Sequence, residues 1–223
     1  MKKGYFITGT DTGVGKTWAT VALMRYFKRQ GQSVVGMKPV AAGCEWIDGQ
    51  LKNEDALLLQ ENSSLALDYS EINPYAFEMP VSPHLAAIDE TVQLNELVQA
   101  FNKIKNKADV VIVEGAGGWL APLSDDYDIA DLASALQIPV IMVVGIRLGC
   151  INHARLTFQA IQASGVECAG WLAMCVDNDM DKQSENISTL KNKISAPLLG
   201  VLPYVKEKEF DVLVNHINGE KLI

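Results

Sequence analysis

The sequence has few of the features that suit a nucleic-acid-binding or membrane protein. Its 223 residues carry a formal net charge of −8, so it lacks the excess of cations that a polyanion or an anionic membrane attracts. No apolar run approaches the ~20 residues that are needed to span a bilayer. We therefore expect neither nucleic acid nor a membrane among the partners of this chain.

The sequence also lacks the paired cysteine spacings of zinc sites and disulfide-rich proteins. The four cysteines, Cys44, Cys150, Cys168 and Cys175, show no CxxC spacing, which argues against a zinc site and against a disulfide framework. Because the N-terminus runs directly into an apolar strand, we expect no signal peptide. The expected location is the cytoplasm.

What is present is an ordinary globular composition, with 48% hydrophobic and 21% charged residues. The length suits one large domain with a substantial core. There is no internal repeat, low-complexity linker or break in composition. We predict a single domain over residues 1–223.

Short apolar runs alternate with segments of helical periodicity along the whole chain. This alternation predicts an α/β fold, a doubly wound and mostly parallel sheet with helices on both faces. The predicted strands are 5–8, 33–37, 108–113, 140–144, 168–174 and 198–202, and the predicted helices are 18–27, 56–60, 94–104, 128–137, 150–164 and 182–193. Residues 41–53 are predicted to be a loop, and residues 63–93 to form short helices and excursions.

The stretch GTDTGVGKT, residues 9–17, lies between the first strand and the first helix. A glycine-rich turn that ends in Gly-Lys-Thr in this context is a phosphate-binding loop. Its amides and the helix N-terminus attract phosphate, Lys16 reaches the β- and γ-phosphates, and Thr17 completes a Mg²⁺ shell. The strict pattern requires glycine where this chain has Thr10, and Gly9 lies one residue too early.

Polar residues at predicted strand ends are the next candidates, because ligands bind beyond the carboxyl ends of parallel strands. Glu114 closes an apolar strand and is either a Mg²⁺ ligand or a carboxylate that faces water. Lys38 is either solvated or part of the site. Asp55 is either a ligand or one charge of a plain helix-start cluster.

A helix that begins at Gly149-Cys150-Ile151-Asn152 offers free amides that could bind an anion, a weak signal because every helix has such an end. His84 and His153 show no partner pattern for a catalytic triad, so nucleophilic hydrolysis is unsupported.

Taken together, the motifs resemble those of the dethiobiotin synthetase family, the ATP-dependent carboxylases of biotin synthesis. The resemblance runs from the first strand to the last, and its most specific parts are VEGAGGW and LGCINH. The offset glycine of the phosphate loop is itself a feature of the family. The matching stretches are GTDTGVGKT (9–17), KPVAAGCE (38–45), NEDAL (53–57), NPY (73–75), SPH (82–84), VEGAGGW (113–119), PLSD (122–125), VGxxLGCINH (144–153), AGW (169–171) and APLLGxLP (196–203).

The resemblance implies a reaction in which CO₂ and 7,8-diaminopelargonate form a carbamate and ATP phosphorylates it. The second amine then closes the ureido ring with loss of phosphate, which gives dethiobiotin. It also implies a homodimer, with the distant carboxylate of the substrate bound at the helix start Gly149–Asn152 of the other subunit.

Carried over residue by residue, the resemblance assigns Lys16, Lys38 and Thr12 to the carbamate and the transferred phosphate. Thr17, Asp55 and Glu114 would hold Mg²⁺. The substrate-binding residues would be Ala42, Gly149, Cys150, Ile151 and Asn152. The ATP-binding residues would be Gly13, Val14, Gly15, Lys16, Thr17, Trp18, Asp55, Glu114, Gly115, Ala116, Gly117, Met174, Cys175, Pro203, Tyr204 and Val205.

The sequence departs from the family pattern at three places. Ala42 stands where a serine is frequent, and Gly13 where a glutamate is frequent. The asparagine that reads adenine is replaced by Met174, followed by Cys175. Base recognition would then depend on the backbone around Pro203, Tyr204 and Val205, which leaves the preference for ATP over other triphosphates open.

Other phosphate-loop proteins fit less well. A switch-type ATPase, which acts through dimerisation and a protein partner, is the main alternative, but it usually carries a second lysine early in the loop. Residues 176–179 lack the lysine of a guanine-binding motif. Cobyrinate-type amide synthetases need a further glutaminase region, and no arginine-rich lid marks a small-molecule kinase.

Overall fold

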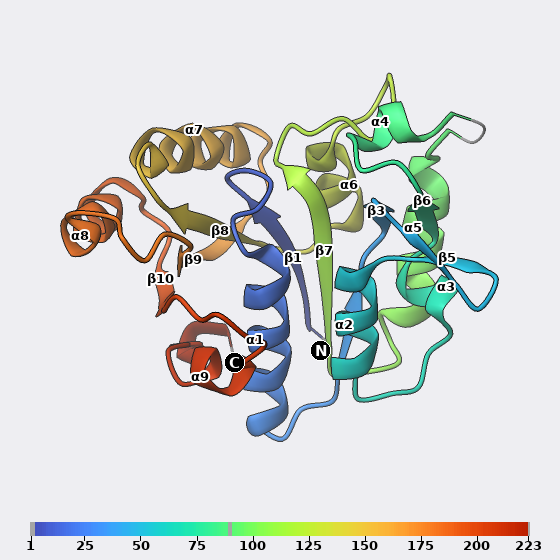
Figure 1. Ribbon diagram of the computed structural model, residues 1–223, viewed down its shortest axis with the longest axis horizontal. Coiled ribbons are helices and arrows are strands. Elements are labelled where there is room, and N and C mark those ends of the chain that lie inside the picture. Colours follow the sequence, from blue (N-terminus) through green and yellow to red (C-terminus); the bar gives the residue numbers. More distant parts are fainter. Residues whose placement is uncertain (1–2, 89–90, 223) are drawn as a thin grey trace.

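The structure, a computed structural model, describes residues 3–88 and 91–222. A six-stranded sheet lies at its centre (Figure 1). Every neighbouring pair in this sheet is parallel, and the strand order is β10-β9-β8-β1-β7-β2. The predicted doubly wound α/β fold is confirmed. The strands of the sheet are β1 (Lys3–Gly9), β2 (Val34–Met37), β7 (Val110–Gly118), β8 (Val140–Ile146), β9 (Cys168–Cys175) and β10 (Leu198–Leu202).

These strands form where the sequence has continuous apolar runs. All seven residues of β8 are buried, as are all four of β2. Strands that are covered on both faces favour such uninterrupted hydrophobic runs over alternation. The complete burial of β8 agrees with its place near the middle of the sheet, next to β1.

Helices pack on the sheet on both sides. Figure 1 shows α1 in front of the sheet and α6 behind it. α1 packs against β1, β2 and β7, whereas α7 and α8 pack against β8. The helices of eight residues or more are α1 (Lys16–Arg29), α2 (Glu54–Asn62), α5 (Leu94–Ile104), α6 (Ile129–Leu136), α7 (Cys150–Ala163) and α8 (Gln183–Lys193).

The predicted loop at 41–53 was wrong, because short strands occupy most of it. β4 (Glu45–Ile47) and β5 (Gln50–Lys52) form an antiparallel hairpin. Its two turn residues, Asp48 and Gly49, have φ values of 52° and 76°. An Asp-Gly pair with positive φ at both positions is a preferred hairpin turn, a signal that the sequence carried.

The region 63–93 contains the short helices that were expected and one strand that was not. The helices are α3 (Tyr69–Ile72) and α4 (Pro83–Ala86), and the strand is β6 (Tyr75–Phe77). β6 pairs in parallel with β3 (Val40–Ala42), and these two strands form a small sheet that is separate from the central sheet and from the β4–β5 hairpin. After β10 the chain adds α9 (Phe210–Val214) and a 3₁₀ turn, Glu220–Leu222, neither of which was predicted.

Glu114 was expected at the end of its strand, but β7 continues four residues beyond it to Gly118. Its register partner is Ile7 of β1, and the register then shifts before Gly9 pairs with Gly118. The glycines after Glu114 allow the strand to follow the phosphate loop closely. Glu114 therefore lies inside the sheet and not at its edge.

Within the two described ranges, none of the helices combines the length and apolar character required to cross a bilayer.

Candidate active site

The phosphate-binding loop connects β1 to α1 and has the backbone that its glycines predict. Gly13 and Gly15 have φ values of 70° and 81°, in the left-handed region that glycine enters without strain. Gly15 caps α1, so the first helical residue is Lys16. Val14 is buried against Gly145 of β8 and anchors the loop in the core. The free amides of the α1 N-terminus thus face the place where phosphate would bind.

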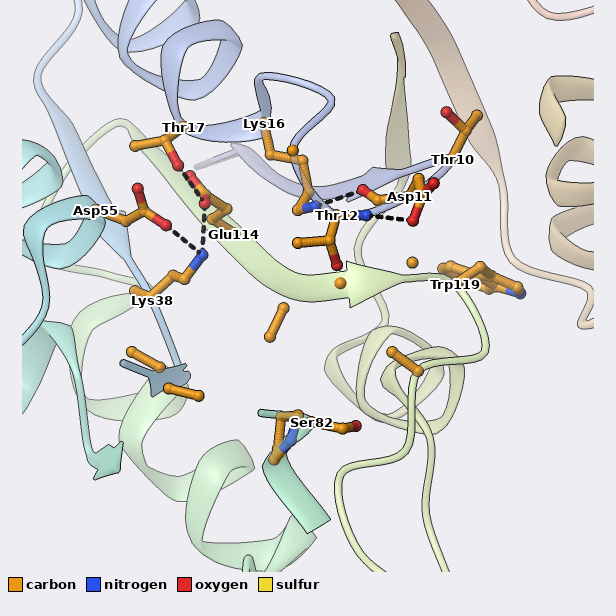
Figure 2. A pocket seen from close by; sticks show the side chains of 18 of the residues that line it. Thr10, Asp11, Thr12, Lys16, Thr17, Lys38, Asp55, Ser82, Glu114 and Trp119 are labelled. Carbon is orange, nitrogen blue, oxygen red and sulfur yellow. Dashed lines mark hydrogen bonds and ion pairs between the residues drawn. The ribbon is translucent and has the colours of Figure 1, made fainter. Parts of the chain in front are cut away.

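Lys16 folds back onto the loop in Figure 2. Its Nζ donates to the carbonyl oxygen of Asp11 at 2.9 Å. Burial, together with the nearby cation of Lys38, lowers the pKa of Lys16 to about 8. A phosphate group beside this amine would raise its pKa again and favour its charged form.

Lys38, Asp55, Glu114 and Thr17 meet in one hydrogen-bonded cluster, shown in Figure 2. Lys38 Nζ donates to Glu114 Oε1 at 2.6 Å and to Asp55 Oδ2 at 3.2 Å. Thr17 Oγ1 donates to the same Glu114 oxygen at 2.8 Å. The structure thus joins residues from α1, α2, β7 and the end of β2, and neither Lys38 nor Glu114 is solvated.

Charge pairing governs the protonation of this cluster. Burial alone would lower the pKa of Lys38, but Glu114 and Asp55 outweigh it, so the pKa lies above its usual value. Burial would likewise raise the pKa of Asp55, but the charge of Lys38 holds that pKa below its usual value. Both side chains are therefore charged at neutral pH.

The donor set of this cluster suits Mg²⁺. Glu114 is fully buried, and its Oε2 has no hydrogen-bond partner among the described atoms. A buried carboxylate oxygen without a partner is costly unless a cation or water meets it. Thr17, Asp55 and Glu114 offer only oxygens, the ligands that Mg²⁺ prefers. Only two of these three residues are carboxylates, and the described part of the chain has no group of three or more His, Cys, Asp or Glu that could hold a metal ion.

The cluster and the phosphate loop line one cavity of about 1010 Å³. The cavity is also lined by residues 80–83, before and within α4, and by Leu156, Thr157 and Ala160 of α7. This volume suits a nucleotide and a second small molecule together. The predicted site residues that line it are Thr12, Gly13, Gly15, Lys16, Thr17, Trp18, Lys38, Ala42, Asp55, Glu114, Ala116 and Gly117.

Several other predicted residues lie outside this cavity. Gly115 contacts the Lys38 cluster only through its carbonyl oxygen, which accepts a hydrogen bond from Lys38 Nζ at 3.4 Å. Met174 and Cys175 are buried at the end of β9, and Pro203, Tyr204 and Val205 follow β10. The helix start Gly149, Cys150, Ile151 and Asn152 is likewise absent from the lining.

Sequence reasoning missed the residues that support the cluster from behind. Asn53 and Asn73 stand only within the NEDAL and NPY stretches of the family resemblance. Asn53 nevertheless caps α2 through a bond from Asp55 N to its Oδ1. An N-cap residue followed at once by two acidic residues was the available signal for Asn53.

A family model described as "AAA domain" matches residues 3–210. Curated relatives match nearly the whole chain at about half identity. The ATP-dependent dethiobiotin synthetase BioD of Xanthomonas axonopodis pv. citri is 50% identical over 202 residues, which cover 90% of each chain. BioD 1 of Escherichia coli K12 is 49% identical over 209 residues, which cover 93% of each.

Solved structures resemble the chain in fold. The MinC:MinD cell division protein complex of Aquifex aeolicus matches with a TM-score of 0.59 at 16% identity, over 97% of this chain and 87% of that chain. The signal recognition particle receptor FtsY of Elizabethkingia anophelis, in complex with GDP, matches with a TM-score of 0.55 at 16% identity, over 96% of this chain and 64% of that chain. At this identity the likeness supports the fold alone.

Proposed function

The chain belongs to the ATP-dependent dethiobiotin synthetase family and is a ligase of biotin biosynthesis, and we propose that it carboxylates 7,8-diaminopelargonate with CO₂. CO₂ adds to one amine to form a carbamate, the γ-phosphate of ATP passes to a carbamate oxygen, and the second amine attacks the carbonyl carbon. Phosphate leaves as the ureido ring closes, so the products are dethiobiotin, ADP and phosphate. One observation carries the proposal, the convergence of the phosphate loop with Lys38, Asp55 and Glu114 on a single cavity.

The loop supplies the phosphate half of this reaction. The amides of residues 13–17 and the N-terminus of α1 would hold the β- and γ-phosphates, with Lys16 turning from the Asp11 carbonyl to the γ-phosphate. Thr12 lies at the mouth of the same cavity and would contact the carbamate. The negative charge that grows during transfer would then meet cations that are already in place.

Mg²⁺ would be held by Thr17, Asp55 and Glu114. Bound there, the ion would neutralise charge on the β- and γ-phosphates. Lys38 is already fixed between the two carboxylates and would present its ammonium group to the carbamate and the transferred phosphate. Ala42 lines the cavity beyond it and would form part of the diamine site.

The tail carboxylate of the substrate would bind in a homodimer, at the helix start Gly149–Asn152 of the second subunit. Two features of this chain support the shared site. That helix start does not line the cavity of its own subunit. Leu148, which precedes it, is 92% exposed, and Leu156 on α7 beside the cavity is 57% exposed. Such apolar side chains favour burial against a second copy.

The adenine base would lie near the ends of β9 and β10. Met174 packs against Gly15 there, and the backbone of Pro203, Tyr204 and Val205 is the candidate base reader. The alternative function, a switch-type ATPase with a protein partner, has no support from the solved structures, because a likeness at 16% identity extends to the fold alone.

Release of ADP separates the two functions. The protein is incubated with Mg²⁺, ATP and bicarbonate, with and without 7,8-diaminopelargonate, and both ADP and dethiobiotin are measured. A synthetase forms ADP only with the diamine, and chelation of Mg²⁺ stops both products. ADP release that is unchanged by the diamine, without dethiobiotin, would instead identify a switch-type ATPase.

A further inference from the structure

A buried asparagine lies directly behind Lys38. Asn73, between α3 and β6, is only 3% exposed. Its Nδ2 donates to the carbonyl oxygen of Lys38 at 2.8 Å and to that of Tyr75 at 2.9 Å. Both amide hydrogens of Asn73 are therefore used, and one of them fixes the main chain of the lysine that enters the active site.

The remaining polar atom of Asn73 leads to a buried tyrosine. Its Oδ1 accepts from the Tyr69 hydroxyl at 2.8 Å, and that hydroxyl in turn accepts from the backbone N–H of Asn53 at 2.7 Å. Burial raises the pKa of Tyr69 to about 12, so the hydroxyl keeps its proton and serves as donor and acceptor together.

Asn53 connects this chain of bonds to the metal-binding carboxylate. Its Oδ1 accepts from the backbone N–H of Asp55 at 3.0 Å and so caps α2. The Asp55 side chain accepts from Lys38 Nζ at 3.2 Å. The bonds thus close a ring that starts at the Lys38 carbonyl and returns to the Lys38 ammonium group, through Asn73, Tyr69, Asn53 and Asp55.

We propose that Tyr69 and Asn73 are positioning residues, which hold Asp55 and Lys38 at a fixed separation for Mg²⁺ and the transferred phosphate. This inference rests on the proposed function, because it takes Asp55 as a ligand and Lys38 as the reacting cation. Main-chain bonds already hold Lys38, since its N–H donates to Ile72 O at 2.8 Å. The ring of side-chain hydrogen bonds also connects the start of α2 to Lys38, and the position of Asp55 depends on this connection.

The energetic consequence concerns metal binding more than folding. Groups that orient a metal ligand from behind typically change metal affinity or activity about 10- to 100-fold when they are removed. The Tyr69 hydroxyl is the link that can be removed with the least disturbance, because Tyr69→Phe keeps the ring and its packing. Asn73→Ala would remove three hydrogen bonds and open a space in the interior.

Tyr5 provides a matched control. It is buried to nearly the same degree, 6% exposed against 7% for Tyr69, and its hydroxyl donates to the carbonyl oxygen of Leu222 at 2.7 Å. That bond lies between β1 and the C-terminal turn, away from the ring. Tyr5→Phe therefore removes one buried hydroxyl bond without touching Asp55 or Lys38.

The experiment compares both variants with the parent protein in denaturant unfolding, in the Mg²⁺ concentration that gives half-maximal rate, and in ATP affinity with and without Mg²⁺. Tyr69→Phe loses two hydrogen bonds and Tyr5→Phe loses one, so we expect the larger loss of stability in Tyr69→Phe. Tyr69→Phe should raise the half-maximal Mg²⁺ concentration about tenfold and weaken ATP binding only when Mg²⁺ is present. Tyr5→Phe should leave both values within about twofold of the parent.

A double variant tests whether Tyr69 acts through Asp55. In an Asp55→Asn background, Tyr69→Phe should change the Mg²⁺-dependent part of ATP affinity by less than about twofold. The inference would be overturned if Tyr69→Phe kept its full effect in that background. It would also be overturned if, with an active parent, Tyr69→Phe and Tyr5→Phe had the same half-maximal Mg²⁺ concentration and the same Mg²⁺-dependent ATP affinity. A parent that forms no dethiobiotin would refute the proposed function instead, and the Mg²⁺-dependent binding would still decide the role of Tyr69.

Discussion

Arg147 Nη2 lies 2.6 Å from Asp11 Oδ2, which ties the turn after β8 to the phosphate loop. The same aspartate orients the loop twice more, since its Oδ1 accepts from Thr12 N and its carbonyl oxygen accepts from Lys16 Nζ. Asp11 therefore contacts both Lys16 and Arg147, and it connects the phosphate loop to the turn that leads directly into the helix start at Gly149.

Arg147→Met should weaken ATP binding while it barely changes stability. Both side chains of the pair are two-fifths exposed or more, and such pairs contribute about 0–1 kcal/mol to folding. Loss of the constraint on Asp11 should weaken ATP binding about threefold to tenfold, comparable to one net hydrogen bond. Binding is measured by titration calorimetry and stability by urea unfolding.

The matched control is Lys107→Met, because Lys107 pairs with Glu71 at similar exposure and neither residue lines the cavity. It should cost as little stability and leave ATP affinity unchanged. Equal ATP affinities in the two variants would show that the Asp11–Arg147 pair has no part in nucleotide binding.

Gly15→Ala should destabilise the protein for two separable reasons. Its φ of 81° costs an L-residue about 1–2 kcal/mol, and the new Cβ would lie 2.7 Å from Met174 Cγ. Gly31→Ala has a similar φ of 77° but no described atom within 4 Å of its Cβ, so it isolates the backbone cost. Thermal or denaturant unfolding of both variants gives the difference.

Trimming Met174 tests the steric share of that cost. In a Met174→Ala background, Gly15→Ala should lose no more stability than Gly31→Ala does in the parent protein. An equal cost of Gly15→Ala in both backgrounds would mean that Met174 does not press on the loop.

Lys38→Met should be strongly destabilising, because it leaves the fully buried Glu114 without its cation. Removal of one partner of a buried ion pair costs about 3–5 kcal/mol. A second change, Glu114→Gln, should restore a large part of that stability because no buried charge remains. Neither variant should turn over, since the cation and the metal ligand are lost. Unfolding and product assays on the single and double variants measure both effects, and a double variant as unstable as Lys38→Met would contradict this role for the ion pair.

Mixed dimers test the shared active site. Lys16→Ala disables the phosphate loop, and Asn152→Asp places a repelling carboxylate at the helix start. If each site uses both subunits, random mixing of the two inactive proteins should restore about one quarter of the parent activity, because half the dimers are mixed and each has one intact site. Mixed dimers that are isolated by two affinity tags and remain inactive would place the whole site in one chain.

The sequence predicted the elements that depend on local pattern. Continuous apolar runs located all six strands of the central sheet, and the amphipathic spacing of residues 94–104 gave α5 with its observed bounds. The Asp48-Gly49 hairpin was missed although its turn residues are typical, because the flanking strands have only three residues each. β3 and β6 pair across more than thirty residues, and no local pattern reports such a partner.

The site was predictable where a motif carries the chemistry and not where tertiary contacts do. The phosphate loop could be identified from residues 9–17 together with the apolar strand before them and the helical periodicity after them. Lys38 remained ambiguous because its burial depends on Glu114, 76 positions away, and on Asp55. Asn73 and Tyr69 were not singled out for a role, since a hydrogen bond to a distant main-chain atom leaves no mark in the sequence around either residue.

A ¹³C label shows whether the protein incorporates CO₂ into the ureido ring. The protein is incubated with ¹³C-bicarbonate, 7,8-diaminopelargonate, Mg²⁺ and ATP, and the product is examined by mass spectrometry and ¹³C NMR while ADP is counted. We expect dethiobiotin with the label in its ureido carbonyl, one ADP for each ring closed, and no product from Lys16→Ala. Formation of ADP without labelled dethiobiotin at saturating substrate would refute the proposed carboxylation.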